Sequence, residues 1–190
     1  QSKVDSYNSQ PTDSIRATTN PLEDMATSKI SLRPFTRLGG ADHGWLNTRH
    51  HFSFADYFDM NRMHWGALRV INDDIIESGS GFPPHPHRGM EIVTYVLGRN
   101  PHPAVGNKLE GGAGIKHGDN HGNGGVTEPG DVQVMSVGTE GVVHSEFHPG
   151  RSVKESTNIL QIWIMPDERI QKSTWGTRHF PRADTSGKFV

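Results

Sequence analysis

Two pairs of residues in this sequence have the spacing of metal ligands. His85 and His87 are separated by one proline, and His144 and Glu146 by one serine. Side chains two residues apart point to the same face of an extended chain, so each pair can present two ligands in one direction if its segment is a strand. Two such pairs on neighbouring strands would offer three imidazole nitrogens and one carboxylate oxygen to a single ion. This set leaves open positions for water, a substrate or dioxygen.

A second carboxylate competes for the same role. Glu91 stands four residues after His87 and could reach an ion held there, in which case Glu146 would act as a supporting group or general base. No other two histidines stand at this spacing. His50 and His51 are adjacent, so a strand would send them to opposite faces. We interpret the following as ordinary loop or core histidines: His50, His51, His64, His102, His117, His121, His148 and His179.

The absence of cysteine limits which metal ions the chain can hold. The sequence has no cysteine, so thiolate ligands and disulfides are excluded, and nitrogen and oxygen must hold the ion. Closed structural zinc sites usually use sulfur, whereas three nitrogens and one carboxylate suit redox-active iron. We expect one divalent ion, Fe(II), with manganese, nickel, copper, cobalt and zinc as alternatives that affinity alone does not exclude.

Composition argues against several classes of partner. The 190 residues carry a formal net charge of -2, which gives no electrostatic reason to expect direct binding to nucleic acid or to a membrane surface. The 32% of hydrophobic residues include no apolar run that could span a bilayer. The absence of cysteine fits a reducing compartment, so we expect a cytoplasmic protein. The length suffices for one sizeable domain.

Short strands separated by turns must position the candidate ligands. GMEIVTYVLG, close after the first histidine pair, alternates in a way that predicts a strand with both faces mostly buried. Gly66–Asn72 and Asp74–Glu77 predict two short strands before a turn at Gly79–Gly81. Further strands are predicted near Ile115–His117, over Val132–Val137, in GVVHSEFHPG and in NILQIWIMP. With no segment that predicts a helix of ordinary length, the chain is expected to be all-β, an antiparallel sandwich or barrel.

Several longer stretches resemble the pirin family of the cupin superfamily. They are HPHRGMEIVTYVL, HGDNHGNGGVTEPGDVQVMSVGTEGVVHSEF and LQIWIMP, and WLNTRHHFSFADYF and GALRVINDDIIESGSGF extend the similarity. The resemblance runs from about Ile30 to about Arg182 and is strongest to bacterial pirin-like quercetin 2,3-dioxygenases. It implies a single-domain cupin β-barrel, also called a double-stranded β-helix or jelly roll.

The resemblance also implies a site and a reaction. The family's metal ligands correspond to His85, His87, His144 and Glu146, which assigns the carboxylate to Glu146 instead of Glu91. The implied activity is oxidative opening of a ring of flavonols such as quercetin, with dioxygen as the second substrate and Glu146 doubling as the catalytic base. Animal pirins are instead nuclear, iron-dependent transcriptional coregulators. A redox-sensing regulator without turnover is therefore the alternative function.

The substrate pocket is less well defined by the sequence. No motif identifies its walls, and Phe82, Met135 and Phe147 are candidates only because they neighbour the ligands along the chain. Residues Arg99–Gly112 intrude where the family has a short turn. We expect this insertion to lie on a surface loop near the mouth of the barrel, which leaves the identity of the substrate open.

The resemblance divides the chain into parts. Residues 1–29 are polar and lack periodicity, so we expect a disordered tail; residues 30–182 form the metal-binding cupin domain, and residues 183–190 a C-terminal tail. The resemblance implies a second barrel in most members of the family, and we expect this second cupin domain to be absent here. We expect the face that it covers to be covered here by an extended arm carrying Trp163, Trp175 and Phe180, or by a second chain in a homodimer, the outcome that we favour.

Overall fold

The computed structural model describes residues 31–98, 113–150, 155–167 and 171–180. All strands lie within the compact unit Arg33–Val190. Within the described residues the regular structure is β-strand apart from one 3-10 turn, η1 (Phe35–Arg37), which confirms the all-β prediction. In the same residues, no helix is long and apolar enough to span a bilayer. The expected tail over residues 1–29 and the insertion over residues 99–112 lie outside the described residues.

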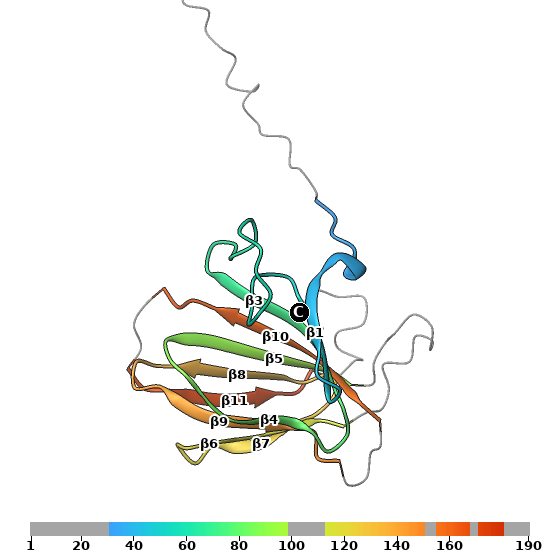
Figure 1. Cartoon of the computed structure of the whole chain (residues 1–190). Helices are drawn as coiled ribbons and strands as arrows, with labels where there is room; N and C mark the ends of the chain where they lie inside the picture. Colours follow the sequence, from blue (N-terminus) through green and yellow to red (C-terminus); the bar gives the residue numbers. More distant parts are fainter. Residues whose placement is uncertain (1–30, 99–112, 151–154, 168–170, 181–190) are drawn as a thin grey trace, which may run out of the picture. The chain divides into compact units, whose positions relative to one another are not determined.

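The strands form two antiparallel sheets that face each other (Figure 1). The larger sheet has the order β1 (Gly39–Asp42), β2 (Leu46–His50), β3 (Leu68–Ile76), β10 (Thr157–Ile164), β5 (Met90–Gly98), β8 (Val132–Val137) and β11 (Thr174–Arg178). The smaller sheet has the order β4 (Gly81–His87), β9 (Val142–Phe147), β6 (Ile115–Asp119) and β7 (Gly124–Thr127). The arrangement confirms the predicted cupin β-barrel in a single domain.

The prediction of two short strands before the histidine pair is wrong, because β3 is continuous through them. The sequence N-D-D at residues 72–74 looks like a break, yet Asn72 and Asp74 are both buried on the inner face of β3, together with Val70 and Ile76. Polar side chains are tolerated there because this part of the inner face borders a cavity. The turn follows at Glu77–Ser80, close to the predicted position.

The prediction that β5 is buried on both faces is also wrong. Ile92, Thr94 and Val96 are buried, whereas Val93 and Leu97 are half-buried and Tyr95 is 36% exposed. The outer face of β5 is therefore only partly buried, in contrast to its inner face.

A row of polar side chains crosses the inner face of the larger sheet. The members are cross-strand neighbours and all are buried: His50 on β2, Asn72 on β3, Gln161 on β10, Thr94 on β5 and Gln133 on β8. Five adjacent polar positions inside a barrel require hydrogen-bond partners, because each unpaired buried group costs about 1–3 kcal/mol. Three members of this polar row, Thr94, Gln133 and Gln161, donate hydrogen bonds to Glu146 of the smaller sheet, in the candidate functional site.

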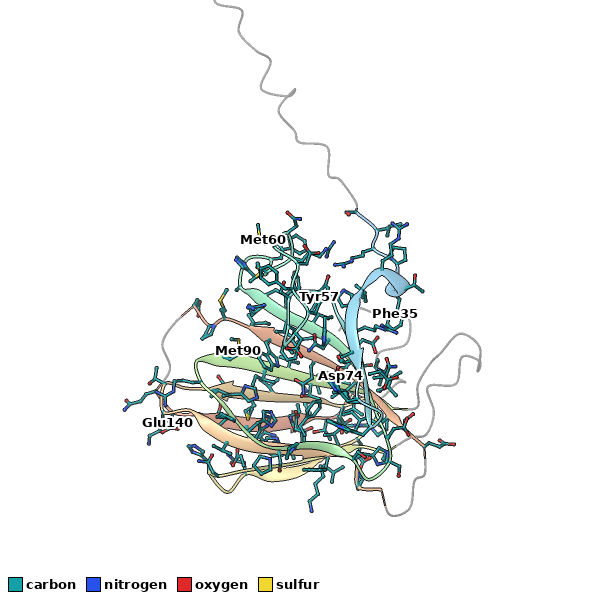
Figure 2. The ribbon with its side chains drawn as sticks, viewed as in Figure 1. Phe35, Tyr57, Met60, Asp74, Met90 and Glu140 are labelled. Carbon is teal, nitrogen blue, oxygen red and sulfur yellow. The ribbon has the colours of Figure 1, made fainter. Side chains whose placement is uncertain are left out.

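Two apolar clusters join the sheets on either side of the polar row. One comprises Leu46, Ile76, Val96 and Ile159 of the larger sheet with Ile115 of the smaller sheet. The other comprises Ile92, Met135 and Val137 of the larger sheet with Val142 of the smaller sheet. Side chains fill the space between the sheets (Figure 2). Full burial of such a side chain contributes about 1.5–3 kcal/mol, so the apolar clusters hold the polar row between them.

The end of the chain, where an extended arm over an exposed face was predicted, contains β11. Its residues pair with β8 at the edge of the larger sheet. Trp175 on β11 stacks on His117 of β6 in the smaller sheet, with ring centroids 5.2 Å apart and planes inclined by 14°. Trp163, which was assigned to the same arm, instead lies on β10. The arm therefore links the two sheets where β11 and β6 approach each other.

The contact between β4 and β9 can be tested at a glycine. A Cβ atom at Gly81 would lie 2.2 Å from the carbonyl oxygen of Glu146 and 2.5 Å from the Cα of Phe147. These are backbone atoms, so Gly81→Ala must push the strands apart. We expect a loss of about 2–3 kcal/mol in unfolding free energy, seen by calorimetry as a lower melting temperature.

The matched control is Gly118→Ala on β6, where a Cβ atom meets open space. This variant should melt close to the unmodified protein. Equal melting temperatures for the two variants would contradict the close approach of β4 to β9.

Candidate metal centre

The smaller sheet presents the candidate ligands in two cross-strand rows. In one, His144 on β9 lies between His85 on β4 and Asp119 on β6. In the other, Glu146 on β9 lies next to His117 on β6. Because residues i and i+2 of a strand share a face, the two rows point toward the larger sheet together. The histidine pair of β4 and the His144–Glu146 pair of β9 thus lie side by side on neighbouring strands.

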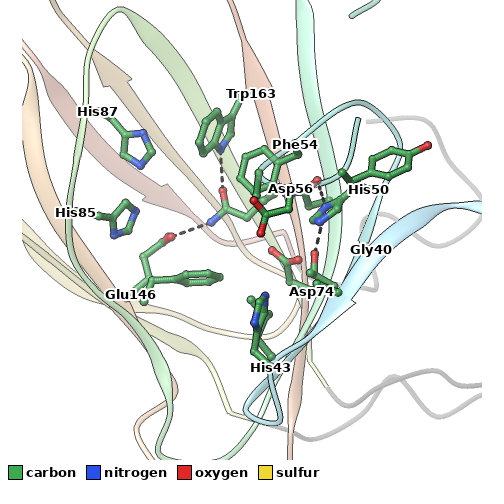
Figure 3. A pocket seen from close by; sticks show the side chains of 18 residues that line it. Gly40, His43, His50, Phe54, Asp56, Asp74, His85, His87, Glu146 and Trp163 are labelled. Atoms are coloured by element: carbon green, nitrogen blue, oxygen red, sulfur yellow. Dashed lines mark hydrogen bonds between the residues drawn. The ribbon is translucent and has the colours of Figure 1, made fainter. Parts of the chain in front are cut away.

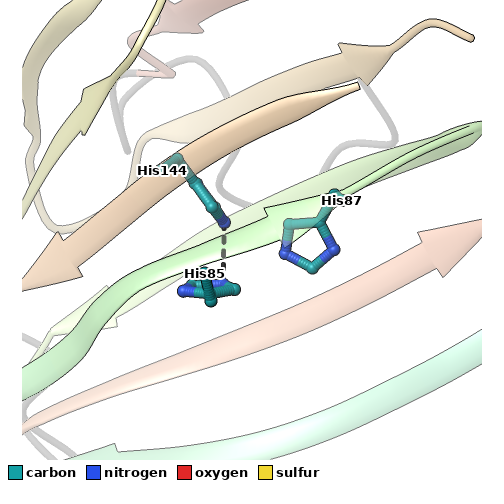
Figure 4. Close-up of side chains that lie close together, drawn as sticks. All are labelled: His85, His87 and His144. Carbon is teal, nitrogen blue, oxygen red and sulfur yellow. Dashed lines mark hydrogen bonds between the residues drawn. The ribbon is translucent and has the colours of Figure 1, made fainter. Parts of the chain in front are cut away.

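Three histidines converge on one point (Figure 4). The nearest ring nitrogens of His85, His87 and His144 all lie within 4.8 Å of one another. The Nε2 atoms of His85 and His144 are 2.9 Å apart. Two lone pairs at that distance repel, so the pair requires either a proton or a cation between its nitrogens. Nitrogens that are each about 2.0–2.1 Å from one cation come within about 3 Å of each other, which matches this spacing.

Burial keeps His144 and His87 neutral. The pKa of His144 is lowered to about 2, chiefly by burial and then by the neighbouring His85 and His87. The pKa of His87 is lowered to about 4 by burial and by His85. Neutral imidazoles have a lone pair to donate, so a cation binding at neutral pH does not have to displace protons from these two rings.

Hydrogen bonds set which ring nitrogens face the centre of the cluster. His85 Nδ1 donates to the Pro83 carbonyl at 2.8 Å, which leaves the Nε2 lone pair free. His144 Nδ1 lies 3.3 Å from Nδ1 of His117, whose Nε2 lies 3.7 Å from Asp119 Oδ2. If His144 Nε2 faces a cation, its proton sits on Nδ1 and is donated to His117, whose own proton then faces Asp119. His117 is therefore a positioning residue for His144.

Glu146 is fully buried between the sheets and accepts three hydrogen bonds from the polar row. Its Oε1 accepts from Thr94 Oγ1 at 3.2 Å and from Gln133 Nε2 at 3.1 Å. Its Oε2 accepts from Gln161 Nε2 at 2.8 Å. Three strands of the larger sheet thus hold one carboxylate of the smaller sheet.

The two glutamines are themselves oriented toward the carboxylate. Gln133 Oε1 accepts a hydrogen bond from Thr127 Oγ1 at 3.3 Å. Gln161 Oε1 accepts one from Trp163 Nε1 at 3.3 Å. Because the oxygen end of each amide is occupied by a donor, the amino end must face Glu146. Both glutamine amides are thus oriented to donate hydrogen bonds to an ionised Glu146 carboxylate.

The charge of Glu146 fits a metal site. Burial raises the pKa of its carboxyl, while His85 and the three hydrogen bonds act in the opposite direction. A cation beside Glu146 would offset the remaining desolvation of the carboxylate. Neutral imidazoles, a buried carboxylate and the absence of sulfur together form a donor set that fits one divalent cation.

The structure divides the predicted ligands into two overlapping groups. One group contains His85, His87 and His144; the other contains His117, His144 and Glu146. Among the described residues, neither group holds all four predicted ligands. The two groups share His144, whose Nε2 faces His85 and whose Nδ1 faces His117. His85 and His87 are half-buried, whereas the second group is fully buried, so the open side lies toward His85 and His87.

The competing carboxylate, Glu91, is not part of the cluster. It lies on β5 at odd spacing from Thr94, which donates to Glu146, so Glu91 points to the opposite face of the sheet. There its Oε1 accepts a hydrogen bond from Ser136 Oγ at 2.6 Å. The structure thus removes the alternative that spacing alone left open.

A cavity of about 500 Å³ borders the cluster. His85, His87 and Glu146 lie on one side of it, with Phe54 and Trp163 along the wall (Figure 3). The rings of Phe54 and Trp163 meet edge to face at 5.3 Å. The candidate metal site thus opens on a space with aromatic walls.

One of the three pocket residues suggested by the sequence lines this cavity. Phe82 does, from the β4 strand that carries the histidines. Met135 instead belongs to an apolar cluster, and Phe147 is 36% exposed. Those two suggestions are wrong because proximity along the chain does not set the face of a strand on which a side chain lies.

Several residues of the site were missed by the sequence analysis. His50 and His117 were interpreted as ordinary histidines, yet His50 lines the cavity and His117 contacts His144. Thr94, Gln133 and Gln161 were not singled out. In the sequence, each of these residues is recognisable only as a lone polar residue inside an apolar strand, as in NILQIWI. The facing sheet is needed to show that such a residue has a buried partner.

Comparisons with known proteins agree with this architecture. The family model for Pirin matches residues 31–164. The chain is 52% identical over 161 residues to a pirin-like protein of Caulobacter vibrioides, covering 85% of this chain and 62% of that protein. It is 48% identical over 151 residues to a quercetin 2,3-dioxygenase of Escherichia coli, covering 80% of this chain and 58% of that protein. The chain thus spans about three-fifths of the length of these curated relatives.

A solved structure adds a metal to the comparison. The bacterial pirin YhhW from Escherichia coli, in complex with nickel(II), has a TM-score of 0.66 and 38% identity to this chain. The match covers 83% of this chain and 65% of that one. Together with the His/Glu cluster, this similarity supports a single metal ion in this barrel.

Removal of the histidines tests the cluster directly. We expect the purified protein to hold about one divalent ion per chain, measured by elemental analysis. His85→Ala and His144→Ala should each remove most of it, because affinity depends on the number and geometry of the ligands. The matched control is His43→Ala, since His43 lines the same cavity but belongs to neither group. Stoichiometric metal in the double variant His85→Ala/His144→Ala would contradict the site.

The positioning role of His117 makes a separate prediction. His117→Phe should weaken metal binding about 10- to 100-fold, because the ring can no longer accept the Nδ1 proton of His144. His117→Gln keeps an acceptor and should recover part of the affinity. Chelator competition measures the affinity, and nitrogen NMR reports the tautomer of His144. If His117→Phe changes neither quantity, the role is contradicted.

Proposed function

Because this chain belongs to the pirin family, we propose that it is a metal-dependent dioxygenase that opens a ring of flavonols such as quercetin. In this proposal His85, His87, His144 and Glu146 hold one divalent cation, and Glu146 also takes a proton from the substrate. The three histidines converge, and Glu146 comes within 4.8 Å of His144. His85, His87 and Glu146 line the same cavity, so ion and substrate would share one space.

The observation that carries the proposal is the cavity beside the histidines. A purely structural ion needs no open side and no space for a ligand. Here the half-buried side of the cluster borders about 500 Å³, within the range of roughly 300–1,000 Å³ common for ligand pockets. Phe54, Phe82 and Trp163 supply aromatic surface around it. Such walls suit a planar aromatic substrate.

Fe(II) is the ion that we propose for the cell. Three imidazoles and one carboxylate suit iron, and dioxygen chemistry requires a partner that can change its redox state. Nickel(II) in the related bacterial pirin supports binding of a divalent first-row ion by this barrel. Manganese, cobalt, copper and zinc share the same ligand preferences, so metal content has to be measured on protein prepared without added metal.

The residues of the chain provide proton transfer and orientation. When bound, the cation supplies Lewis acidity, which favours the ionised form of an adjacent hydroxyl, and a redox partner for dioxygen. Glu146 Oε2 is the atom that we assign to receive the hydroxyl proton, since a carboxylate oxygen with the single hydrogen bond from Gln161 keeps a free lone pair. Burial raises the pKa of Glu146 and makes it a stronger base than an exposed carboxylate.

Oxygen uptake tests the function. With Fe(II) and quercetin, the protein should consume dioxygen as the flavonol absorbance disappears, and metal-free protein should not. Glu146→Gln should lower the rate by about 100-fold or more, because it removes both a ligand charge and the base. His43→Ala should bind metal normally and serves as the control.

The alternative function predicts a different result. A redox-sensing regulator would bind iron and change its oxidation state without sustained dioxygen uptake. Stoichiometric iron with no turnover of quercetin or of other flavonols would therefore contradict the dioxygenase and favour the regulator.

A further inference from the structure

The cavity has a second polar end, away from the histidine cluster. His43, His50 and Asp74 lie on the side opposite His85 and His87 (Figure 3). His43 is exposed, whereas His50 and Asp74 are only 3% exposed. The function proposed above uses only the end that carries the histidine cluster, so the opposite end has no role yet.

Asp74 is an unsatisfied acid at this end. Its Oδ1 is buried and has no hydrogen-bond partner among the described residues. A buried acceptor without a partner costs about 1–3 kcal/mol, and such groups in native proteins commonly have a functional reason. Asp74 is not needed for the sheet hydrogen bonds of β3, which its backbone makes whatever its side chain.

The neighbours of Asp74 satisfy its side chain only in part: the Thr48 hydroxyl hydrogen-bonds to the carboxyl, but Oδ1 has no partner among the described residues. His50 Nδ1 donates to Asn72 Oδ1 at 2.9 Å, and burial lowers the pKa of His50, so this ring is neutral. The Asn158 amide donates to the Asp74 backbone carbonyl and to the Asp73 carboxylate. The charged groups that act on Asp74 are the acids Asp73 and Glu146, which repel its negative charge. Thr48 is thus the only neighbour shown to donate to the Asp74 side chain, and a ligand in the cavity that Asp74 lines is the remaining source of a donor for Oδ1.

The walls between the two ends limit the ligand. Phe54, Phe82 and Trp163 are aromatic, and Leu46 is aliphatic. A ligand that spans the cavity must be planar and largely apolar in its middle. It must carry oxygen atoms for the cation at one end and a hydroxyl donor at the other. This description fits a polyhydroxylated aromatic compound.

We propose that Asp74 accepts a hydrogen bond from a ring hydroxyl of the flavonol, at the end of the substrate opposite the metal cluster, and thereby selects polyhydroxylated flavonols over unsubstituted ones. This inference rests on the proposed function. It adds a specificity-determining residue and explains why one oxygen of a buried acid has no partner among the described residues. A phenol is the suitable donor because it is neutral and its ring continues the aromatic contacts of the walls.

Binding of two flavonols to metal-loaded protein tests the subsite. Quercetin and 3-hydroxyflavone share the hydroxyl and keto oxygens that would face the cation, but only quercetin carries further ring hydroxyls. Wild type should bind quercetin about 10-fold more tightly, as expected when one hydrogen bond contributes about 1.5 kcal/mol. Asp74→Asn and Asp74→Leu should lose most of this preference and leave binding of 3-hydroxyflavone nearly unchanged.

The matched control is Asp56→Asn, which alters an exposed acid of the same cavity and should preserve the preference. If the Asp74 variants keep the wild-type preference, or lose affinity for both flavonols equally, the subsite is overturned while the dioxygenase proposal stands. If metal-loaded wild type binds neither flavonol, both the proposed function and the Asp74 subsite are contradicted.

A second measurement needs no ligand. Burial raises the pKa of Asp74 to about 7 from an ordinary value of 3.8, so ionisation of this acid opposes folding increasingly as the pH rises from about 4 to 7. Asp74→Asn removes that penalty. The metal-loaded variant should therefore gain melting temperature at pH 8 relative to wild type, and gain less at pH 5. A loss of stability at both pH values would show that Asp74 supports the fold, and would overturn the assignment.

Discussion

The burial of one carboxylate constrains most of this barrel. Glu146 lies between the sheets, where an unpaired charge would be strongly unfavourable. It is held by Thr94, Gln133 and Gln161, which come from three strands of the facing sheet and are adjacent in cross-strand register. A shift of any of these strands by one residue would turn its donor to the outer face and leave the carboxylate unpaired. The carboxylate therefore ties the register of the larger sheet to the smaller one.

The two sheets contribute different groups to the site. The smaller sheet carries the candidate ligands and His117, whereas the larger sheet carries the hydrogen-bond donors that orient Glu146. Apolar clusters on both sides of the polar row keep the sheets at the distance at which these groups meet. Apolar packing thus stabilises the association of the two sheets, and the hydrogen bonds to Glu146 fix their relative position. A close-packed interior resists small displacements, which keeps these groups in place.

The strand that bears the first histidine pair is suited to an open site. β4 is the edge strand of the smaller sheet, and Pro83, Pro84 and Pro86 remove backbone donors that a central strand would need. The prolines also protect the edge from pairing with another chain. The register irregularity between Phe82 and His85 coincides with two of the prolines. His85 can consequently border a cavity and still lie directly opposite His144.

The sequence alone determined the two ligand pairs and most of the strands. Residues i and i+2 share a face in any strand, so the convergence of His85 with His87, and of His144 with Glu146, is a local property of the chain. Only the tertiary structure decided which carboxylate faces the histidines, that β3 continues through its polar residues, and that Asp74 is buried beside a cavity. These outcomes depend on partners across strands; the donors to Glu146 lie 13 to 52 residues away along the chain. The face of a strand that becomes the interior is set when the two sheets pack, and local spacing does not contain that information.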